Sequence, residues 1–281
     1  MAINLNTSVV DALVDATLSE DLQNGDITTR NIFDDEDNAI AEVIARESMV
    51  LCGLEIFQAI FNKLTTKVTF TSCKYKDGDE VNAGDTIIKF QCGVIPLLEG
   101  ERSALNILQW LSGISTLTQK FVQKAAPVKV LDTRKTTPSL RVFEKYAVKC
   151  GGGNNHRFGL YDQVLIKDNH IEAAGSISNA VNHVKKIVNQ DKKLEIEVKN
   201  LEEVEEAINN NVDIIMLDNM SFETIKKSVS LINGKSKIEI SGGITYEILA
   251  EVSKTGADYV SVGTLTHSAP AVDISMKITP V

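Results

Sequence analysis

The second half of the chain alternates short apolar runs with longer segments in which apolar residues recur at helical spacing. The apolar runs have the length of strands and cover residues 128–134, 164–169, 194–198, 212–219, 237–243 and 259–264. The helical spacing covers residues 177–188, 201–208, 222–232 and 245–252. Strands and helices that follow one another in this way form βα units, whose strands pair in parallel. The pattern therefore predicts an α/β domain built around a parallel sheet.

The first half follows a different pattern. A helix is predicted at about residues 8–20, and strands alternate through residues 39–46 and 68–92, where turn residues separate them as in small β-sandwich modules. A long helix is predicted over residues 98–122 and would connect the two parts of the chain. We interpret the β-rich part as scaffold, because no lysine stands at a turn tip to carry a lipoyl or biotinyl group.

Polar residues collect where the predicted strands of the second half end. They are Arg134 and Lys135, Lys167 and Asp168, Glu197, Asp218 and Asn219, Ser241, Gly242 and Gly243, and Gly263 and Thr264. In a closed α/β barrel the carboxyl ends of the strands form the active site. A doubly wound open sheet places polar residues at the same edge. The pattern favours a barrel and leaves the open sheet as the alternative.

The composition is that of a soluble globular enzyme and limits the classes of partner. The chain has 43% hydrophobic and 24% charged residues, and its net charge of −9 with 5% aromatic residues argues against nucleic acid as a partner. No apolar run approaches the roughly 18 residues of a membrane span. No basic residue precedes Arg30, so no secretory signal is predicted, and the four cysteines lack the spacing of a zinc site. We expect a cytoplasmic protein with reduced thiols.

One window runs against the acidic charge of the chain. Between Arg134 and Lys167 there are seven lysine and arginine residues and two acidic ones. Arginine is a planar fork suited to carboxylate or phosphate, and lysine is a mobile point charge. Three glycines at 151–153, followed by His156 and Arg157, would let a ligand approach the backbone closely. The window therefore indicates a site for a small anion.

Two carboxylates end consecutive predicted strands. Glu197 and Asp218 stand amid apolar residues, and paired carboxylates there can hold Mg²⁺ or stabilise positive charge in a transition state. Glu195 shares the strand face of Glu197 by period-two alternation and ranks behind it. The sequences ISGGI at 240–244 and SVGT at 261–264 are typical of the backbone amides that hold a phosphate on the last strands of many barrels.

Taken together, these motifs resemble the quinolinate phosphoribosyltransferase family, the decarboxylating nicotinate-nucleotide pyrophosphorylases of NAD synthesis. The long motif DTRKTTPSLRVFEKYAVKCGGGNNHRFGLYD at 132–162 carries most of the resemblance, and LIKDNHI, EIEV, MLDN and ISGGI follow it in order. EDLQNGDITT and EGERSALNILQWLSGIST extend it to nearly the whole chain. The resemblance implies an amino-terminal α/β sandwich domain over residues 1–112, which the extreme carboxyl end could join, and an incomplete α/β barrel over residues 113–281.

The resemblance also implies a reaction and the roles of the site residues. The family transfers the phosphoribosyl group of phosphoribosyl pyrophosphate to quinolinate, with Mg²⁺ as cofactor, in a homodimer that can assemble further and whose sites span the subunit interface. The residues that match quinolinate-binding positions are Arg134, His156, Arg157 and Lys167, with Arg102 from the neighbouring subunit. The catalytic candidates, which match positions that meet phosphoribosyl pyrophosphate and its magnesium, are Lys135, Glu197 and Asp218. The positions that hold the 5′-phosphate are matched by Ser241, Gly242, Gly243 and Gly263.

Three positions depart from the family pattern, and other functions stay open on the sequence. Ser139 stands where glycine is usual, which bears on the local loop geometry, whereas Lys149 for arginine and Asp168 for glutamate are milder changes. A homologous pyrophosphorylase with a different acceptor, such as the molybdenum-associated relatives, would keep the phosphate site without the full basic set. A Schiff-base aldolase would use Lys167 as its nucleophile. A non-catalytic phosphate-binding protein would bind ligand without releasing pyrophosphate.

Overall fold

The computed structural model describes residues 5–187 and 192–281, which fold into two compact units. The first unit comprises the chain up to Gln119 together with Pro138–Gly152 and Ser268–Val281. The second comprises Lys120–Thr137 and Gly153–His267. The chain therefore passes between the units several times. The sequence-based division into domains at residue 112 stays a prediction.

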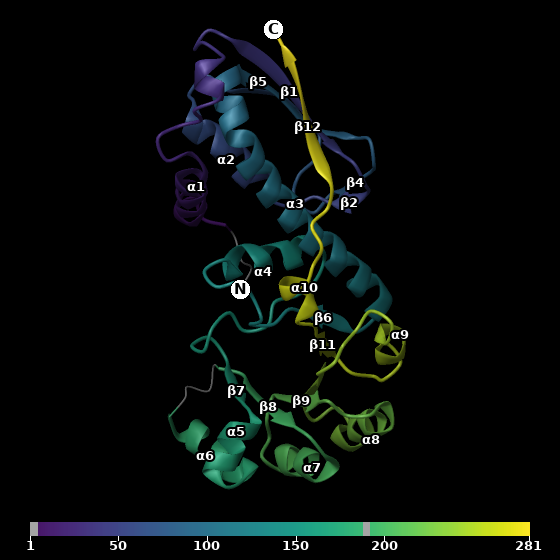
Figure 1. Ribbon diagram of the computed structural model, residues 1–281. Helices are drawn as coiled ribbons and strands as arrows, with labels where there is room; N and C mark the ends of the chain where they lie inside the picture. Colours follow the sequence, from purple (N-terminus) through teal and green to yellow (C-terminus); the bar gives the residue numbers. More distant parts are fainter. Residues whose placement is uncertain (1–4, 188–191) are drawn as a thin grey trace. The chain divides into compact units, whose positions relative to one another are not determined.

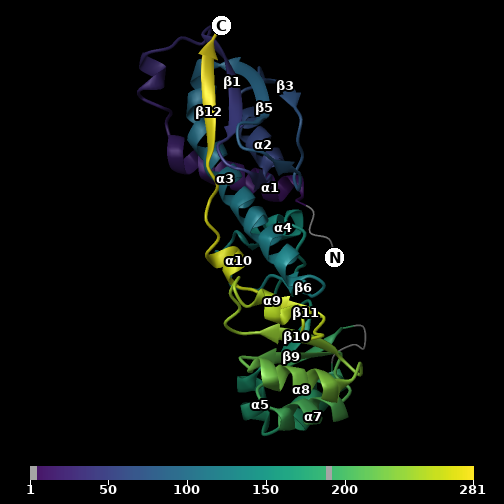
Figure 2. The same cartoon turned by 90° about the vertical axis from the view of Figure 1, so that its right-hand side faces the viewer.

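An antiparallel sheet forms the centre of the first unit. Its strands, in the order β12-β1-β5-β3, are β12 (Ile274–Pro280), β1 (Asn38–Ala45), β5 (Thr86–Gly93) and β3 (Thr69–Cys73). The carboxyl-terminal strand β12 pairs with β1 along its length, from Ala39 opposite Pro280 to Ala45 opposite Ile274 (Figure 2). A separate two-stranded sheet joins β2 (Met49–Val50) to β4 (Glu80–Val81). The extreme carboxyl end is thus a structural part of the first unit.

Helices make up much of the rest of the first unit, and one of them packs on the sheet. They are α1 (Thr7–Leu22), α2 (Leu54–Leu64), α4 (Arg141–Cys150) and the long α3 (Val94–Ala125), with a short 3₁₀ turn at Thr29–Asn31 (Figure 1). Phe57 and Phe61 of α2 pack on Phe90 of β5, with ring centroids 5.9 and 4.7 Å apart. All three side chains are fully buried. This aromatic cluster fixes α2 on the sheet through a large apolar contact area.

The backbone at Ser139, just before α4, takes the conformation that a glycine would favour. Its φ is +67°, in the left-handed region. A residue with a Cβ atom costs roughly 1–2 kcal/mol more than glycine in this region. The serine therefore raises the free energy of the turn and leaves the glycine-type turn in place.

Six parallel strands form the second unit. In the order β6-β11-β10-β9-β8-β7 they are β6 (Lys129–Leu131), β11 (Tyr259–Ser261), β10 (Lys237–Ser241), β9 (Ile214–Asp218), β8 (Leu194–Val198) and β7 (Val164–Ile166). Each lies within an apolar run expected from the sequence. The chain just before β7 returns to β6, where Asn154 bridges Leu131 in parallel. The predicted α/β fold with an incomplete barrel is confirmed.

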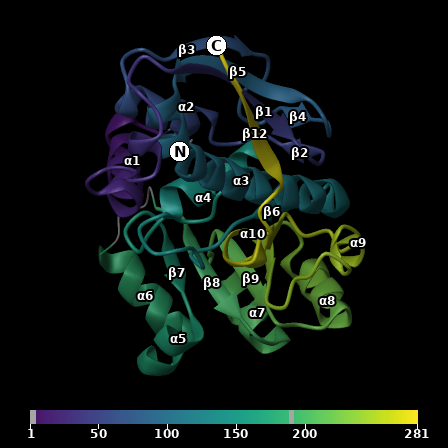
Figure 3. The same cartoon turned by 45° about the horizontal axis from the view of Figure 1, so that its top comes forward.

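Helices connect these strands on their outer side. They are α5 (Asp168–Ala174), α6 (Ile177–Ile187), α7 (Leu201–Asn209), α8 (Phe222–Ile232), α9 (Leu249–Val252) and α10 (Thr264–His267); Val188, expected to end α6, lies outside the described residues. Figure 3 shows α6, α7 and α8 following one another along strands β7 to β9, and they bury Val181, Val204 and Ile225. Within residues 5–187 and 192–281, no helix has both the length and the apolar character needed to cross a membrane.

Candidate active site

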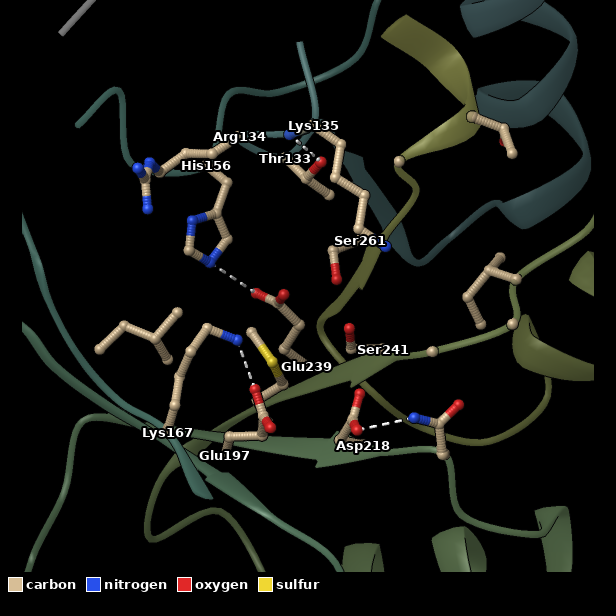
Figure 4. Close-up of a pocket in the computed structure, with 18 of the residues that line it drawn as sticks. Thr133, Arg134, Lys135, His156, Lys167, Glu197, Asp218, Glu239, Ser241 and Ser261 are labelled. Atoms are coloured by element: carbon tan, nitrogen blue, oxygen red, sulfur yellow. Dashed lines mark hydrogen bonds and ion pairs between the residues drawn. The ribbon is translucent and has the colours of Figure 1, made fainter. Parts of the chain in front are cut away.

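A cavity of about 780 Å³ opens at the carboxyl ends of the parallel strands in the second unit (Figure 4). Its lining unites residues that lie far apart in the sequence: Thr133, Arg134, Lys135, His156, Arg157, Leu165, Lys167, Glu197, Met216, Asp218, Asn219, Glu239, Ser241, Gly242, Gly243, Ile244, Thr245, Ser261, Gly263, Thr264 and His267. Of the site residues expected from the sequence, Arg102 alone is outside this lining. It is exposed on α3, in the first unit. The roles of all these residues stay predictions.

Strand ends position the charged side chains. Lys167 directly follows β7, Glu197 lies in β8 and Asp218 ends β9. Glu197 stands opposite Met216 in the β8–β9 register. Because side chains on one strand alternate between faces, Asp218 shares the face of Met216, and all three line the cavity. The strand register thus brings the two predicted carboxylates to the same cavity wall.

Lys167 and Glu197 form an ion pair across this edge. The Nζ atom of Lys167 lies 2.6 Å from Oε2 of Glu197. The side chain of Glu197 is 9% exposed and that of Lys167 is 44% exposed. An incoming carboxylate would compete with Glu197 for the ammonium group, and an incoming cation would compete with Lys167 for the carboxylate. Binding of the anionic ligand and binding of the cation that the sequence predicts would therefore both break this ion pair.

Glu197 and Asp218 fit a magnesium ion by the chemistry of their donors. Both present carboxylate oxygens, the ligands that this hard cation prefers. The amide nitrogen Nδ2 of Asn219 donates to Oδ2 of Asp218 at 2.7 Å, which orients that carboxylate. In Figure 4 both carboxylates point into the same space from neighbouring strands. The residues present are suited to hold the ion directly or through water.

A glycine turn follows β10, the strand next to β9. Gly242 and Gly243 adopt φ of +89° and +60°. A Cβ atom at Gly242 would overlap Oδ1 of Asn219, so glycine is required there for space as well as for backbone conformation. Gly263, after β11, leaves room for the Lys135 side chain, whose Cδ would lie 2.9 Å from an added Cβ. Bare backbone amides beside a lysine suit a phosphate group.

Two arginines belong to the cationic part of the lining, together with Lys135 and Lys167. Arg157 is 8% exposed, whereas Arg134 is exposed. Burial, followed by the positive charge of Arg134, lowers the pKa of Arg157 below its usual value. An anion bound between the two guanidinium groups would offset both effects. Buried Asp132 accepts the backbone N–H of His156 at 2.9 Å and so anchors the loop that carries Arg157.

His156 is engaged at both ring nitrogens. Its Nδ1 accepts the backbone N–H of Arg157 at 2.8 Å. Its Nε2 lies 3.1 Å from Oε2 of Glu195 and 3.7 Å from Oε2 of Glu239. With Nδ1 acting as acceptor, a neutral ring carries its proton on Nε2, which lies near both glutamates without forming a hydrogen bond to either. The role of His156 in quinolinate binding stays a prediction, and the structure adds this link to two buried acids.

Glu239 is the acidic residue that the sequence reasoning missed. It lies in the middle of β10, is 1% exposed and lines the cavity, while Glu195 lies fully buried behind it. Burial, followed by the charge of Glu195, raises the pKa of Glu239 to about 8. In the sequence KIEIS at 237–241, Glu239 looks like the polar residue of a strand in which apolar and polar residues alternate. A parallel sheet is buried on both faces, however, so an acid between two isoleucines was a usable signal.

Other cavity residues also escaped the sequence analysis as site candidates. Thr133, Ser261 and His267 line the cavity, and Asn219 does so with a left-handed φ of +52°. Threonine, serine and asparagine are common in turns and at strand ends, so no local pattern singled out these side chains. Asn219 was noted only as a polar residue after a strand. Its contact with Asp218 and its fit against Gly242 appear only once β9 and β10 are paired.

The comparisons with known proteins cover both units. Residues 26–112 match the domain family described as quinolinate phosphoribosyl transferase, N-terminal domain, and residues 114–277 match the corresponding C-terminal domain. A probable carboxylating nicotinate-nucleotide pyrophosphorylase of Bacillus subtilis (strain 168) is 42% identical over 262 residues, covering 92% of this chain and 90% of its own length. A decarboxylating quinolinate phosphoribosyltransferase of Nicotiana tabacum (2b, mitochondrial) is 38% identical over 280 residues, covering 93% of this chain and 80% of its own length.

Solved structures agree with these matches. The crystal structure of NadC from Streptococcus pyogenes superposes with a TM-score of 0.96 at 44% identity, over 99% of each chain. The nicotinate-nucleotide pyrophosphorylase from Francisella tularensis gives a TM-score of 0.95 at 40% identity, also over 99% of each chain. The likeness in sequence and in fold thus extends over essentially the whole chain. This chain belongs to the quinolinate phosphoribosyltransferase family.

Proposed function

We propose that the protein transfers the phosphoribosyl group of phosphoribosyl pyrophosphate to quinolinate, releasing pyrophosphate and CO₂ and forming nicotinate mononucleotide in NAD biosynthesis. The observation that carries this proposal is one cavity whose lining combines the cations of Arg134, Arg157 and Lys167 with the carboxylates of Glu197 and Asp218. A dianionic acceptor and a ribosyl group that gains positive charge need opposite surroundings, and this cavity offers both. The relatives from Bacillus subtilis and tobacco carry names for this activity.

Quinolinate would bind through its two adjacent carboxylates. Arg157 and Arg134 offer planar forks that match carboxylates, and Lys167 offers a point charge at the opposite wall. Binding of the dianion relieves the repulsion between the two guanidinium groups. Because both arginines keep their charge, they orient the ring and take no part in proton transfer. The ring nitrogen is then directed at the sugar.

Phosphoribosyl pyrophosphate would occupy the other side of the cavity. The 5′-phosphate would be held by the backbone amides after β10 and β11, at Ser241, Gly242, Gly243 and Gly263. Lys135, beside Gly263, would meet the pyrophosphate. Glu197 and Asp218 would hold magnesium, which when bound neutralises charge on the leaving pyrophosphate. With the 5′-phosphate and the pyrophosphate held in this way, the reactive C1 atom of the sugar would lie between the phosphate site and the quinolinate site.

The chemistry follows from this placement. Loss of pyrophosphate leaves positive charge on the ribosyl C1, and the carboxylates of Glu197 and Asp218 stabilise that charge electrostatically. The pyridine nitrogen of quinolinate then forms the bond to C1. Because the alkylated nitrogen is cationic, it can stabilise the electron pair left when the 2-carboxylate departs as CO₂. The residues contribute mainly by positioning and by charge.

The proposal includes a homodimer in which Arg102 of each chain completes the site of its partner. Arg102 is exposed on α3, so its guanidinium group is available to a second subunit. A third arginine would increase the positive charge around the quinolinate carboxylates. The homodimer, the use of magnesium and a cytoplasmic location all belong to the proposal.

The direct test is incubation with quinolinate carrying ¹⁴C in its 2-carboxylate, phosphoribosyl pyrophosphate and Mg²⁺. Radioactive CO₂ and nicotinate mononucleotide should form in equal amounts, and omission of phosphoribosyl pyrophosphate should abolish both. Release of pyrophosphate with another pyridine or pyrimidine acceptor, but not with quinolinate, would favour the homologous enzyme with a different acceptor. Absence of pyrophosphate release with any acceptor would reject phosphoribosyl transfer itself.

A further inference from the structure

The proposed reaction requires a proton at one carbon atom. When the bond between C2 of the pyridine ring and its carboxylate breaks, the electron pair stays on C2. This carbon must gain a proton before nicotinate mononucleotide is complete. The donor has to reach into the cavity, hold a proton near neutral pH and leave room for a dianionic substrate. The arginines cannot serve, because they do not release their protons in proteins.

Glu239 meets these conditions by its position. Its carboxyl group projects from the middle of β10 into the cavity, between His156 and the Lys167–Glu197 pair (Figure 4). The side chain is almost fully buried, at 1% exposure. Its Oε1 atom is buried and has no hydrogen-bond partner among the residues that the structure describes. A buried polar atom without a partner in the lining of a cavity can contact a bound ligand or water.

The neighbours of Glu239 explain how it keeps a proton. Ligand atoms of Glu195, Glu239 and His156 lie within 4.8 Å of one another. Burial, followed by the charge of the nearby Glu195, disfavours the ionised form of Glu239. Gln163 donates to Oε2 of Glu195 at 2.7 Å, and Nε2 of His156 lies 3.1 Å from the same oxygen. The hydrogen bond from Gln163 is thus made to Glu195, whereas Oε1 of Glu239 has no partner among the described residues.

A neutral Glu239 also suits the substrate. Lys167, Arg157 and Arg134 line the same cavity and would attract a dianion, which an ionised carboxylate at the floor would repel. The raised pKa of Glu239, about 8, agrees with the geometric argument. The floor therefore presents a carboxylic acid to the part of the ring that loses CO₂.

We propose, on the basis of the proposed function, that Glu239 is the general acid that protonates C2 as CO₂ departs. The bond from C2 to the carboxylate carbon breaks, and the electron pair left on C2 takes the proton from the Glu239 carboxyl group. The new carboxylate faces Nε2 of His156, 3.7 Å away, which stabilises it until product release. Water then returns a proton to Glu239, so the residue is ready for another turnover.

The test combines two substitutions with chemical rescue. Glu239→Gln keeps the size of the side chain and removes the transferable proton; Glu239→Ala removes the carboxyl group and leaves space for a small acid. In each variant kcat for nicotinate mononucleotide should fall about 100-fold or more, the usual effect of losing a general acid. The dissociation constant of quinolinate, measured by calorimetry, should change less than about threefold, because the arginines and Lys167 remain. Formate buffer at a pH low enough to keep part of it as formic acid should restore the rate of Glu239→Ala in a concentration-dependent way, and not that of Glu239→Gln.

Met216→Leu is the matched control for disturbance of the floor, since Met216 pairs with Glu239 in the β9–β10 register. Formate should leave its rate unchanged. Wild-type kcat in Glu239→Gln would overturn the assignment, and so would a folded Glu239→Ala that binds quinolinate but gains nothing from formate. A parallel loss of quinolinate binding and rate would assign Glu239 a structural role and overturn the proposal too. Failure of the wild-type enzyme to convert quinolinate would instead reject the proposed function, which separates the two outcomes.

Discussion

Lys167 and Glu197 form an ion pair across the ends of β7 and β8, with Nζ of Lys167 2.6 Å from Oε2 of Glu197. Each side chain is proposed to bind a different substrate group, so ligand binding must divide the pair. Quinolinate would take the ammonium group, and magnesium or the cationic sugar would take the carboxylate. Each ligand thus frees the group that the other one needs. The pair couples the two halves of the proposed site.

Glu197→Gln should separate catalysis from acceptor binding. The amide keeps the shape but loses the charge that stabilises the ribosyl cation, so kcat should fall about 100-fold. The KM for quinolinate should stay equal or decrease, because Lys167 no longer competes with a carboxylate. Steady-state kinetics with both substrates measures this. Asp168→Asn, which breaks the exposed Lys199–Asp168 pair of 2.9 Å outside the cavity lining, is the control and should change kcat less than about twofold. A raised KM with unchanged kcat in Glu197→Gln would contradict the proposed role.

Gly242→Ala should damage the site through Asn219. The new Cβ atom would overlap Oδ1 of Asn219 and displace the amide that orients Asp218 at 2.7 Å. Because a misplacement of about 1 Å can cost about 100-fold in rate, kcat/KM for phosphoribosyl pyrophosphate should fall by about that factor. Gly234→Ala is the control for backbone strain alone, since its φ is +77° and an added Cβ meets nothing within 4 Å. Both variants should lower Tm, and equal kinetic effects of the two would rule out the steric explanation.

Glu239→Gln should also change how stability depends on pH. The pKa of Glu239 is about 8 in the folded protein and 4.5 as its ordinary value. The folded state therefore binds a proton between these values that the unfolded state has released, and this group makes stability fall as pH rises from about 4.5 to 8. Glutamine does not titrate, so Tm of the variant relative to wild type should rise across this range. A constant difference in Tm from pH 5 to 8 would show that Glu239 does not titrate there.

Mixed dimers test whether Arg102 serves the partner's site. Arg102→Ala and Lys135→Ala should each be nearly inactive alone. In a mixed dimer, one of the two sites combines an intact Lys135 with an intact Arg102. With random exchange, about half of the dimers are mixed, so about a quarter of wild-type activity should return after the two variants are unfolded and refolded together. Single variants refolded alone provide the baseline. If mixed dimers form but no activity returns, Arg102 does not serve the partner's site. It would then act in the site of its own chain or contribute only to the fold.

The strands and most site residues could be predicted from the sequence because their signals are local. The six apolar runs that became β6 to β11 are short and end in polar residues, which marks both the strands and their carboxyl ends. Residues such as Lys167, Glu197 and Asp218 follow from that position alone. The family's usual glycine at position 139 drew attention to the backbone turn there, and the φ of Ser139, +67°, lies in the left-handed region that glycine favours.

The rest depends on contacts that no local pattern contains. Glu195 and Glu239 come from strands that are two places apart in the sheet, and only the order β8-β9-β10 brings them to the same histidine. His156 lines the cavity as expected for a ligand-binding residue, but its bond to the Arg157 backbone and its place near both glutamates could not be predicted from the sequence. Likewise, β12 joins the first unit through pairing with β1, more than 200 residues earlier in the chain. Such relationships follow from tertiary packing.

The comparison of two acceptors tests the central claim most directly. With phosphoribosyl pyrophosphate and Mg²⁺ held constant, kcat/KM would be measured for quinolinate and for nicotinate, which lacks the 2-carboxylate. Loss of one charge-assisted contact costs about 1.5–3 kcal/mol, so nicotinate should react about 10-fold to more than 100-fold more slowly, and only quinolinate should release CO₂. Comparable values of kcat/KM for the two acceptors would contradict the assignment of Arg134, Arg157 and Lys167 to a dicarboxylate.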